Sequence, residues 1–191
     1  MARTSERWLT AAARLRPVSD SSHICAGCPK AVGRTCCEPG EPHGLATLTG
    51  GDIARIREAT RKPSRFFVDE EAFGPLEAHG HAQLRPANEN AIVRGVRRHL
   101  RARDGACVFH SEERGCSLTA DVRPIACRLY PFELDAHGQV RLVIAGRCHA
   151  EEALASPKEV LAALGLDEAS VRALHDALCE ELLDDARSAG E

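Results

Sequence analysis

The stretch GACVFHSEERGCSLTADVRPIACRLYPF, residues 105–132, places three cysteines on segments rich in turn-forming residues. These are Cys107, Cys116 and Cys127, and Cys148 follows after a predicted hairpin. Thiolates on turns that can fold toward a common point are the ligands that a soft metal ion prefers. The stretch therefore predicts a metal centre that holds distant parts of the fold together.

A second group of cysteines precedes this stretch. Cys25 and Cys28 are separated by two residues, a spacing typical of a knuckle that turns two thiolates toward one ion. Cys36 and Cys37 are adjacent, and because neighbouring side chains tend to diverge, either they serve two different centres or only one of them is a ligand. Glycines and prolines across residues 25–42 exclude a regular helix, so this segment needs another source of order.

Eight cysteines allow several kinds of metal centre. They suffice for two four-thiolate sites, for one iron–sulfur cluster with additional thiols, or for a bridged pair of ions, and the spacing does not choose among these. The alternative is that they are small buried hydrophobic residues, since cysteine is among the most buried residue types. Their turn-rich surroundings favour metal binding. The ninth cysteine, Cys179, falls within a predicted helix and is expected to pack.

Size and composition favour a small domain with a thin core. The chain has 191 residues, enough for one domain or a small two-part domain, and only 4% of them are aromatic. A metal centre would offset the shortage of large apolar side chains. The formal net charge of -3 gives no reason to expect a polyanion partner. The arginines that gather over residues 94–103 lack interleaved aromatic residues, so a solvated face is expected there and a nucleic-acid partner is not.

The cysteine usage predicts a cytoplasmic protein without a membrane partner. Residues 1–16 lack the apolar region of a secretory signal, and no stretch approaches the roughly 20 apolar residues that a membrane span needs. In the cytoplasm thiols stay reduced, and clustered cysteines are more often metal-binding or catalytic than disulfide-bonded. The odd count of nine cysteines also argues against a complete disulfide framework.

Helices are expected toward both ends of the chain, with short hairpins between them. The first predicted helix covers residues 4–15, and the second begins with a capping box from Thr49 to Asp52 and ends before Pro63. A short helix capped by Thr119 or Asp121 is predicted to end at Leu129. Further helices are predicted after residue 151, the last over about 167–187. Residues 91–103 fit a helix or a strand, and a helix giving way to a strand near His99 is favoured.

Hairpins are predicted around Asp104-Gly105, around residues 111–115 and between residues 132 and 144. The predicted fold class is therefore α+β: a small irregular domain stapled by metal, with short β-hairpins between N-terminal and C-terminal helices. Three segments are predicted: a helix and loop over residues 1–22, the cysteine-bearing metal-binding domain over residues 23–150, and a helical segment over residues 151–191.

Several short motifs resemble those of a known protein family. They are Gly105-Ala-Cys107-Val-Phe109, Gly115-Cys116-Ser-Leu118, Arg123-Pro124-Ile-Ala-Cys127-Arg128-Leu-Tyr130-Pro131-Phe132, and the first cysteine group followed by Leu48-Thr49 and Asp52-Ile-Ala-Arg55-Ile56. Together they resemble the YkgJ-type cysteine-cluster proteins, whose domain is described as zinc- or iron-chelating. The resemblance covers residues 25–148. The chain departs from the family in the seven residues between Cys28 and Cys36, where the family pattern is more compact.

The resemblance implies a metal-binding protein that holds zinc or an iron–sulfur cluster, without choosing between them, and that serves a protein partner or stores the ion. The ligands that it implies are Cys25, Cys28, Cys36, Cys37, Cys107, Cys116, Cys127 and Cys148. Flagellin lysine methylases contain a similar cysteine cluster, so the alternative is an iron–sulfur-dependent redox or protein-modifying enzyme. No nucleophile–base pair or second cofactor motif indicates catalysis, and the question of an enzymatic activity stays open.

Other polar residues lie close to the cysteines in sequence. Arg123 and Arg128 flank Cys127, where a guanidinium would offset thiolate charge and donate hydrogen bonds to sulfur, and the alternative is that both arginines are exposed. Four histidines near cysteines could each replace a thiolate on zinc: His23, His43, His110 and His149.

Overall fold

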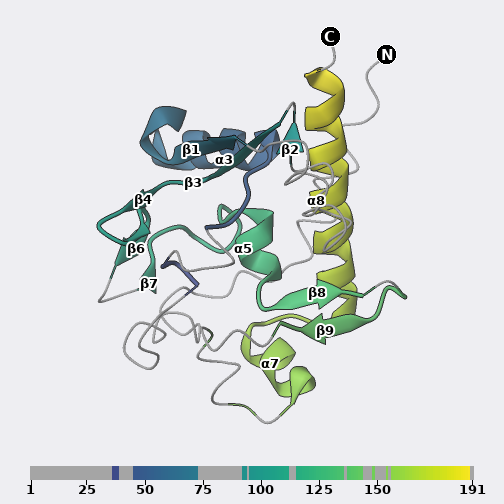
Figure 1. Ribbon diagram of the computed structural model, residues 1–191. Helices are drawn as coiled ribbons and strands as arrows, with labels where there is room; N and C mark the ends of the chain where they lie inside the picture. The colour runs from purple at the N-terminus through teal and green to yellow at the C-terminus, as the bar shows by residue number, and fades with distance from the viewer. Residues whose placement is uncertain are drawn as a thin grey trace.

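The computed structural model describes residues 36–38, 45–72, 92–93, 95–111, 115–135, 137–143, 148, 154 and 156–189, which form an α+β domain (Figure 1). The predicted α+β class with short β-hairpins and C-terminal helices is thus confirmed. The helix predicted over residues 4–15 lies outside the described residues. Across the ranges given above, no helix is both long enough and apolar enough to span a lipid bilayer.

Helix α3 (Gly50–Thr60) begins with the predicted capping box. The Thr49 hydroxyl accepts a hydrogen bond from the Asp52 N–H at 2.9 Å, and the Asp52 carboxylate accepts one from the Thr49 N–H at 3.1 Å. The helix ends at Arg61, whose left-handed backbone has φ 57°, just before Pro63 as predicted. A short 3-10 helix, η1 (Ser64–Phe66), follows.

A three-stranded antiparallel sheet replaces the helix that was predicted between residue 91 and His99. Its strands are β1 (Val68–Ala72), β2 (Ile92–Val93) and β3 (Val96–Leu100), in the order β1-β3-β2. The predicted helix is wrong because β3 pairs with β1 along five residues, a long-range pairing in which Arg97 lies opposite Glu71 and binds it at 2.7 Å. Gly95, at φ 76°, lies between β2 and β3.

Three short hairpins follow the sheet, at the positions that the sequence predicts. Strands β4 (Ala102–Arg103) and β5 (Ala106–Cys107) flank Asp104 and Gly105, whose φ values of 53° and 82° are those of a tight hairpin turn. The other two pairs are β6 (His110–Ser111) with β7 (Gly115–Cys116), and β8 (Phe132–Leu134) with β9 (Val140–Leu142).

Helix α5 (Ile125–Leu129) lies between the second and third hairpins, but its predicted cap is wrong. The helix begins after Pro124, and neither Thr119 nor Asp121 caps it. Instead, the Thr119 carbonyl accepts hydrogen bonds from the N–H groups of Val122 and Arg123, both at 3.0 Å, and closes a turn ahead of the helix.

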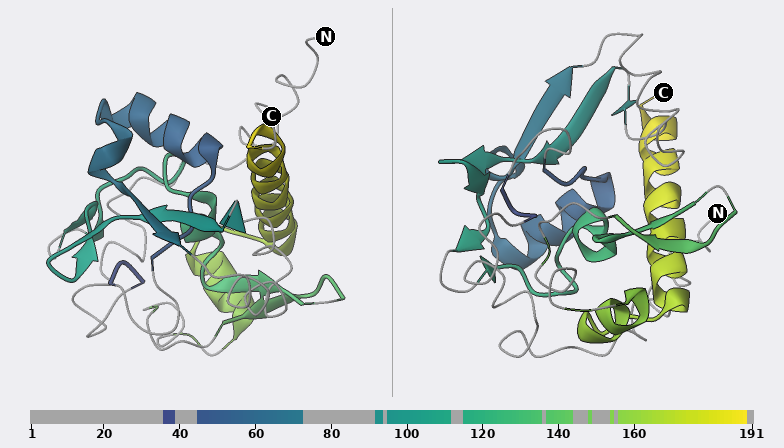
Figure 2. Two further views of the ribbon diagram at one scale, coloured as in Figure 1. Left: turned by 45° about the horizontal axis from the view of Figure 1, so that its top comes forward. Right: turned by 60° about the horizontal axis from the view of Figure 1, so that its bottom comes forward.

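The predicted C-terminal helices are present as α7 (Pro157–Ala163) and α8 (Glu168–Ser188). Ser156 and Asp167 cap them through side-chain oxygens. Helix α8 stands along one side of the molecule, and α5 and β8 pack against it (Figures 1 and 2).

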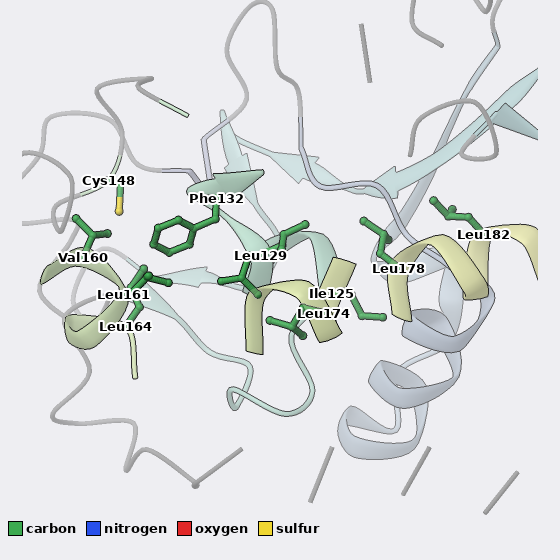
Figure 3. Packing of buried hydrophobic residues seen from close by; sticks show 11 residues of the cluster. Ile125, Leu129, Phe132, Cys148, Val160, Leu161, Leu164, Leu174, Leu178 and Leu182 are labelled. Atoms are coloured by element: carbon green, nitrogen blue, oxygen red, sulfur yellow. The ribbon is translucent and has the colours of Figure 1, made fainter. Parts of the chain in front are cut away.

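Buried side chains form two hydrophobic clusters. The first, termed the C-terminal core, is shown in Figure 3 and consists of Ile125, Leu129, Phe132, Cys148, Val160, Leu161, Leu164, Val171, Leu174, Leu178 and Leu182. The second, termed the cysteine-side core, consists of Leu45, Leu48, Ile56, Phe67, Leu100, Cys107, Phe109 and Leu118. Helix α5 lies between them, because Ile125 and Leu129 belong to the first and Cys127 packs against the second.

Candidate metal site

Four cysteines from four separate segments converge at the cysteine-side core. Cys107 is part of this core, and Cys37, Cys116 and Cys127 pack against it. Burial raises the pKa of the Cys127 thiol well above its ordinary value, and the charges of the other three thiols raise it further. These four groups are therefore close enough to act on one another electrostatically.

Cys107 is fixed by backbone hydrogen bonds. Its N–H donates to the Cys37 carbonyl at 2.6 Å, which holds the Cys37 segment against strand β5. Burial raises the pKa of the Cys107 thiol to about 12, while a hydrogen bond from the Phe109 N–H to the sulfur lowers it. The charges of Cys37 and Cys116 act in the same direction as burial.

Cys116, on strand β7, has the same kind of support. Burial raises the pKa of its thiol, while the Arg123 guanidinium and the Leu118 N–H both lower it by donating hydrogen bonds to the sulfur. The Arg123 Nε donates to the Leu118 carbonyl at 3.0 Å, which holds the guanidinium in place. Arg123 thus contacts a cysteine as predicted, although that cysteine is Cys116 and not the adjacent Cys127.

Two sulfurs therefore receive a hydrogen bond from the N–H two residues further along the chain, in Cys107-Val-Phe109 and in Cys116-Ser-Leu118. A donor at this position stabilises the anionic form of a thiol. Neither Cys107 nor Cys116 takes part in a disulfide bond. The pair of turns is the feature of the site that most favours thiolates.

Other predicted ligands lie elsewhere. Cys36 is exposed while Cys37 is half-buried, which is the divergence expected of adjacent side chains. Cys148 lies in the C-terminal core beside Phe132 and Val160 (Figure 3). Further residues named in the sequence analysis lie outside the described ranges: Cys25, Cys28, His23, His43 and His149.

Cys179 is placed on α8, away from the four converging cysteines. Its sulfur lies 3.8 Å from the His175 Nε2 one turn earlier, and burial raises the pKa of the thiol. The groups that raise this pKa are burial and Asp176, and no other cysteine is among them, so the surroundings of Cys179 fit packing and not the four-cysteine site.

Of the four predicted histidines, His110 is the one that falls within the described residues, and it lies beside this site. It is the direct cross-strand partner of Cys116 in the β6–β7 pair, so the two side chains emerge on the same face. Its Nε2 is buried and has no hydrogen-bond partner among the described residues. Buried polar atoms normally have a partner, so this nitrogen is available to a ligand.

The site is not closed around an ion. Within the described ranges, no three His, Cys, Asp or Glu side chains lie close enough together to hold a metal ion as they stand. The four thiols converge on one region, but coordination would require their sulfurs to move closer together.

An ion-pair network adjoins the cysteines and was not found by sequence reasoning. The buried Asp52 carboxylate binds the Arg55 guanidinium at 2.6 Å, and Arg55 also binds Glu181 of α8 at 2.6 Å. Asp185, one turn further along α8, binds Arg98 at 2.6 Å. Burial raises the pKa of the Asp52 carboxyl above its ordinary value, although the Arg55 charge lowers it.

The same carboxylates of α8 reach the first turn of α3. The Thr49 hydroxyl donates to Glu181, and the Gly50 N–H donates to Asp185 at 2.8 Å. A Cβ at Gly51 would lie 2.6 Å from the Glu181 carboxyl carbon, so glycine permits this close approach. Acidic side chains at a helix N-terminus are favourable because they face the positive end of the helix dipole.

Most of the arginines over residues 94–103 form ion pairs with carboxylates. Arg97 binds Glu71 at 2.7 Å, and Arg101 binds Asp69 at 2.8 Å across the β1–β3 pair. Arg98 belongs to the network described above. Arg128 also adjoins this network, because burial and the Arg55 charge lower its pKa while the Asp52 charge raises it. No cysteine is among the groups that shift the pKa of Arg128, so its predicted role beside the thiolates is not supported.

Comparison of the chain with protein-family models, with curated proteins and with solved structures finds no match. The interpretation of the site therefore rests on its own residues.

Proposed function

We propose that this protein binds a metal centre through cysteine thiolates, with Cys37, Cys107, Cys116 and Cys127 as the ligands of one site. The observation that carries the proposal is the convergence of these four thiols from four separate segments of the chain. A set of four thiolates fits zinc and a four-iron cluster equally well. The proposal therefore names the ligands and leaves two candidate metals, as the resemblance to the YkgJ-type proteins also does.

The surroundings of the sulfurs fit such a centre. The N–H groups of Phe109 and Leu118 and the guanidinium of Arg123 supply hydrogen bonds that favour thiolates. The buried Nε2 of His110 offers a further ligand atom, or a hydrogen bond to one, beside Cys116. A neutral thiol accepts the hydrogen bonds from Phe109, Leu118 and Arg123 only weakly, whereas thiolates bound to a cation would be stabilised by them.

Binding must overcome the present separation and protonation of the thiols. Burial and mutual proximity raise the pKa of Cys107, Cys116 and Cys127, so these groups carry protons at pH 7 in the absence of metal. A cation would reverse this penalty, draw the sulfurs together and release protons. We therefore expect metal affinity to rise with pH.

A bound metal would supply a crosslink between four segments that meet at the cysteine-side core. Cys37 lies before α3, Cys107 and Cys116 on two hairpins, and Cys127 on α5. We propose that the domain acts as a binding module for a protein partner in the cytoplasm, where thiols remain reduced. No contact among the described residues favours the enzymatic alternative over this module.

The test begins with protein purified without oxygen. Visible absorption from sulfur-to-iron charge transfer, with about four iron atoms per chain, would identify a cluster. Colourless protein with about one zinc ion per chain, released when thiols are alkylated, would identify a zinc site. The proposal predicts one of these two results. Protein that contains neither metal, and takes up neither under reducing conditions, would overturn it.

A further inference from the structure

The carboxylate of Asp52 serves two helices at once. It is fully buried, and its Oδ2 accepts the hydrogen bond from the Thr49 N–H that closes the capping box of α3. Its Oδ1 accepts a hydrogen bond from the Ile125 N–H at 3.0 Å, across 73 residues of sequence, and the ion pair with Arg55. A capping box requires only the first of these bonds.

The Ile125 N–H is the first donor of α5, and the structure offers it no other cap. Residue 124 is a proline, which makes no side-chain hydrogen bond to the helix. The helix has only five residues, so its orientation depends on contacts from outside. Asp52 thus supplies the N-terminal cap of α5 from another helix, and Cys127 is the third residue of the helix that it caps.

Apolar packing fixes α5 from the opposite side. Ile125 and Leu129 are one helical turn apart and both belong to the C-terminal core. Cys127, between them in sequence, points away from that face and packs against the cysteine-side core. Packing at one face and a buried hydrogen bond at the N-terminus together fix the backbone of Cys127. Its sulfur can therefore approach Cys107 and Cys116 only by side-chain rotation or by movement of their hairpins.

We infer that Asp52 is a positioning residue for the metal site: its hydrogen bond to the N-terminus of α5 sets the place of the Cys127 thiol. This inference rests on the proposed function. Asp52 is not a ligand, and it contributes to metal affinity through its bond to α5 and not through contact with the ion. The other carboxylates of the network, Glu181 and Asp185, have no bond to α5 and have no such role.

Three variants separate positioning from general stability. Asp52→Ala removes both carboxylate oxygens, and Asp52→Asn removes the charge but keeps one oxygen that can accept from the Ile125 N–H. Asp185→Ala is the matched control, because it removes a carboxylate of the same network that bonds to α3 and β3. The affinity for Zn²⁺ is measured by chelator competition, on protein whose circular dichroism shows that it is folded.

The expected order is clear. Asp52→Ala weakens Zn²⁺ binding by about tenfold or more, the loss typical of removing an outer-shell support. Asp52→Asn recovers roughly threefold of this loss because the bond to α5 is retained. The Zn²⁺ affinity of Asp185→Ala stays within about twofold of that of the parent protein, even if its unfolding midpoint falls as far as that of Asp52→Ala. Equal Zn²⁺ affinities for Asp52→Ala and Asp185→Ala would overturn the inference.

A second readout needs no metal. In the metal-free protein, iodoacetamide should modify Cys127 several times faster in Asp52→Ala than in the parent, while the rate at Cys107 stays unchanged. Peptide mass spectrometry measures both rates. If the parent protein binds neither zinc nor iron, the proposed function fails, and the labelling ratio alone decides the role of Asp52. An unchanged ratio shows that Asp52 does not position Cys127.

Discussion

The two hydrophobic cores of this molecule differ in the side chains that build them. Leucine, isoleucine, valine and one phenylalanine dominate the C-terminal core, where Cys148 is the only buried sulfur among the described residues. The cysteine-side core contains Cys107 and is flanked by three further cysteines. The first core gains its stability from burial of large apolar groups, each worth about 1.5–3 kcal/mol. The second core includes thiols whose ionised form burial disfavours, and a cation would reverse that effect.

The comparison teaches that one small domain can combine two means of holding its chain together. Helix α5 joins them, with Ile125 and Leu129 on the aliphatic side and Cys127 on the sulfur side. We expect changes in the aliphatic core at residues outside α5 to alter stability without altering metal affinity, and changes among the four cysteines to alter both.

The largest effect is expected from Cys127→Ser. Loss of a direct ligand should weaken metal binding by more than about 100-fold, beyond the effect of losing an outer-shell group, and lower the unfolding temperature of the metal-loaded protein. Elemental analysis and thermal unfolding measure the two changes. Cys179→Ser, on α8, is the control and should retain metal. Equal metal content in both variants would contradict the assignment of Cys127.

A smaller effect, confined to stability, is expected in the aliphatic core. Leu178 is 8% exposed, and Leu178→Ala should lower the free energy of unfolding by about 2–5 kcal/mol while leaving the Zn²⁺ affinity of the folded protein unchanged. Leu183, on the same helix, is 41% exposed, so Leu183→Ala should change stability by no more than about 0.5 kcal/mol. Urea unfolding checks both values. If Leu178→Ala also abolishes metal binding in folded protein, the aliphatic core does not act on stability alone and the proposed difference between the two cores is wrong.

The sulfur side alone should respond to alkaline pH. The pKa of Cys107 rises from 9.0 to about 12 on folding, so the unfolded state ionises first. The stability that this thiol contributes is complete below pH 9 and is lost as the pH rises toward 12, at about 1.4 kcal/mol per pH unit. Cys116 and Cys127 add to the loss because their pKa values are also raised.

Urea unfolding at pH 7 and pH 10, with and without Zn²⁺, measures this effect. The metal-free protein should lose at least about 1.4 kcal/mol by pH 10. Coordinated thiolates are already ionised, so the metal-loaded protein should lose much less. Identical losses in the two forms would show that these thiols are not ligands.

The smallest effect concerns the contact between α8 and α3. Gly51→Ala would force the Glu181 carboxylate away from Thr49 and Arg55, and a net loss of about 1 kcal/mol is expected after the gain in helix propensity. In a Glu181→Ala background the obstruction is gone, so the same change should stabilise the protein by up to about 1 kcal/mol. Thermal unfolding compares the parent, Gly51→Ala, Glu181→Ala and the double variant. If Gly51→Ala changes stability in the same direction in both backgrounds, the close-approach explanation is wrong.

Local signals in the sequence predicted local structure well. The capping box at Thr49 and Asp52, the Asp104-Gly105 turn and the hairpin after Phe132 all depend on residues close together in the chain. The helix predicted ahead of His99 failed because the pattern of residues 91–103 fits two periods, and pairing with the distant strand β1 decides between them.

Prediction of the site was limited in the same way. Cysteine spacing indicated which residues to consider, and Cys107, Cys116 and Cys127 do converge. Spacing did not reveal that Cys148 falls in the C-terminal core, because its position depends on how the β8–β9 hairpin packs against α8. The second bond of Asp52, to a helix 73 residues away, also leaves no local trace in the sequence.

X-ray absorption at the metal edge of anaerobically purified protein tests the ligand assignment most directly. If Cys37, Cys107, Cys116 and Cys127 hold one centre, the nearest shell should consist of about four sulfur atoms at about 2.3 Å. In Cys107→Ser a zinc site should lose one of these sulfurs or be empty, and an iron–sulfur cluster should be lost or reduced in amount. A shell dominated by oxygen or nitrogen, or one that is unchanged in composition and amount in Cys107→Ser, would contradict the assignment.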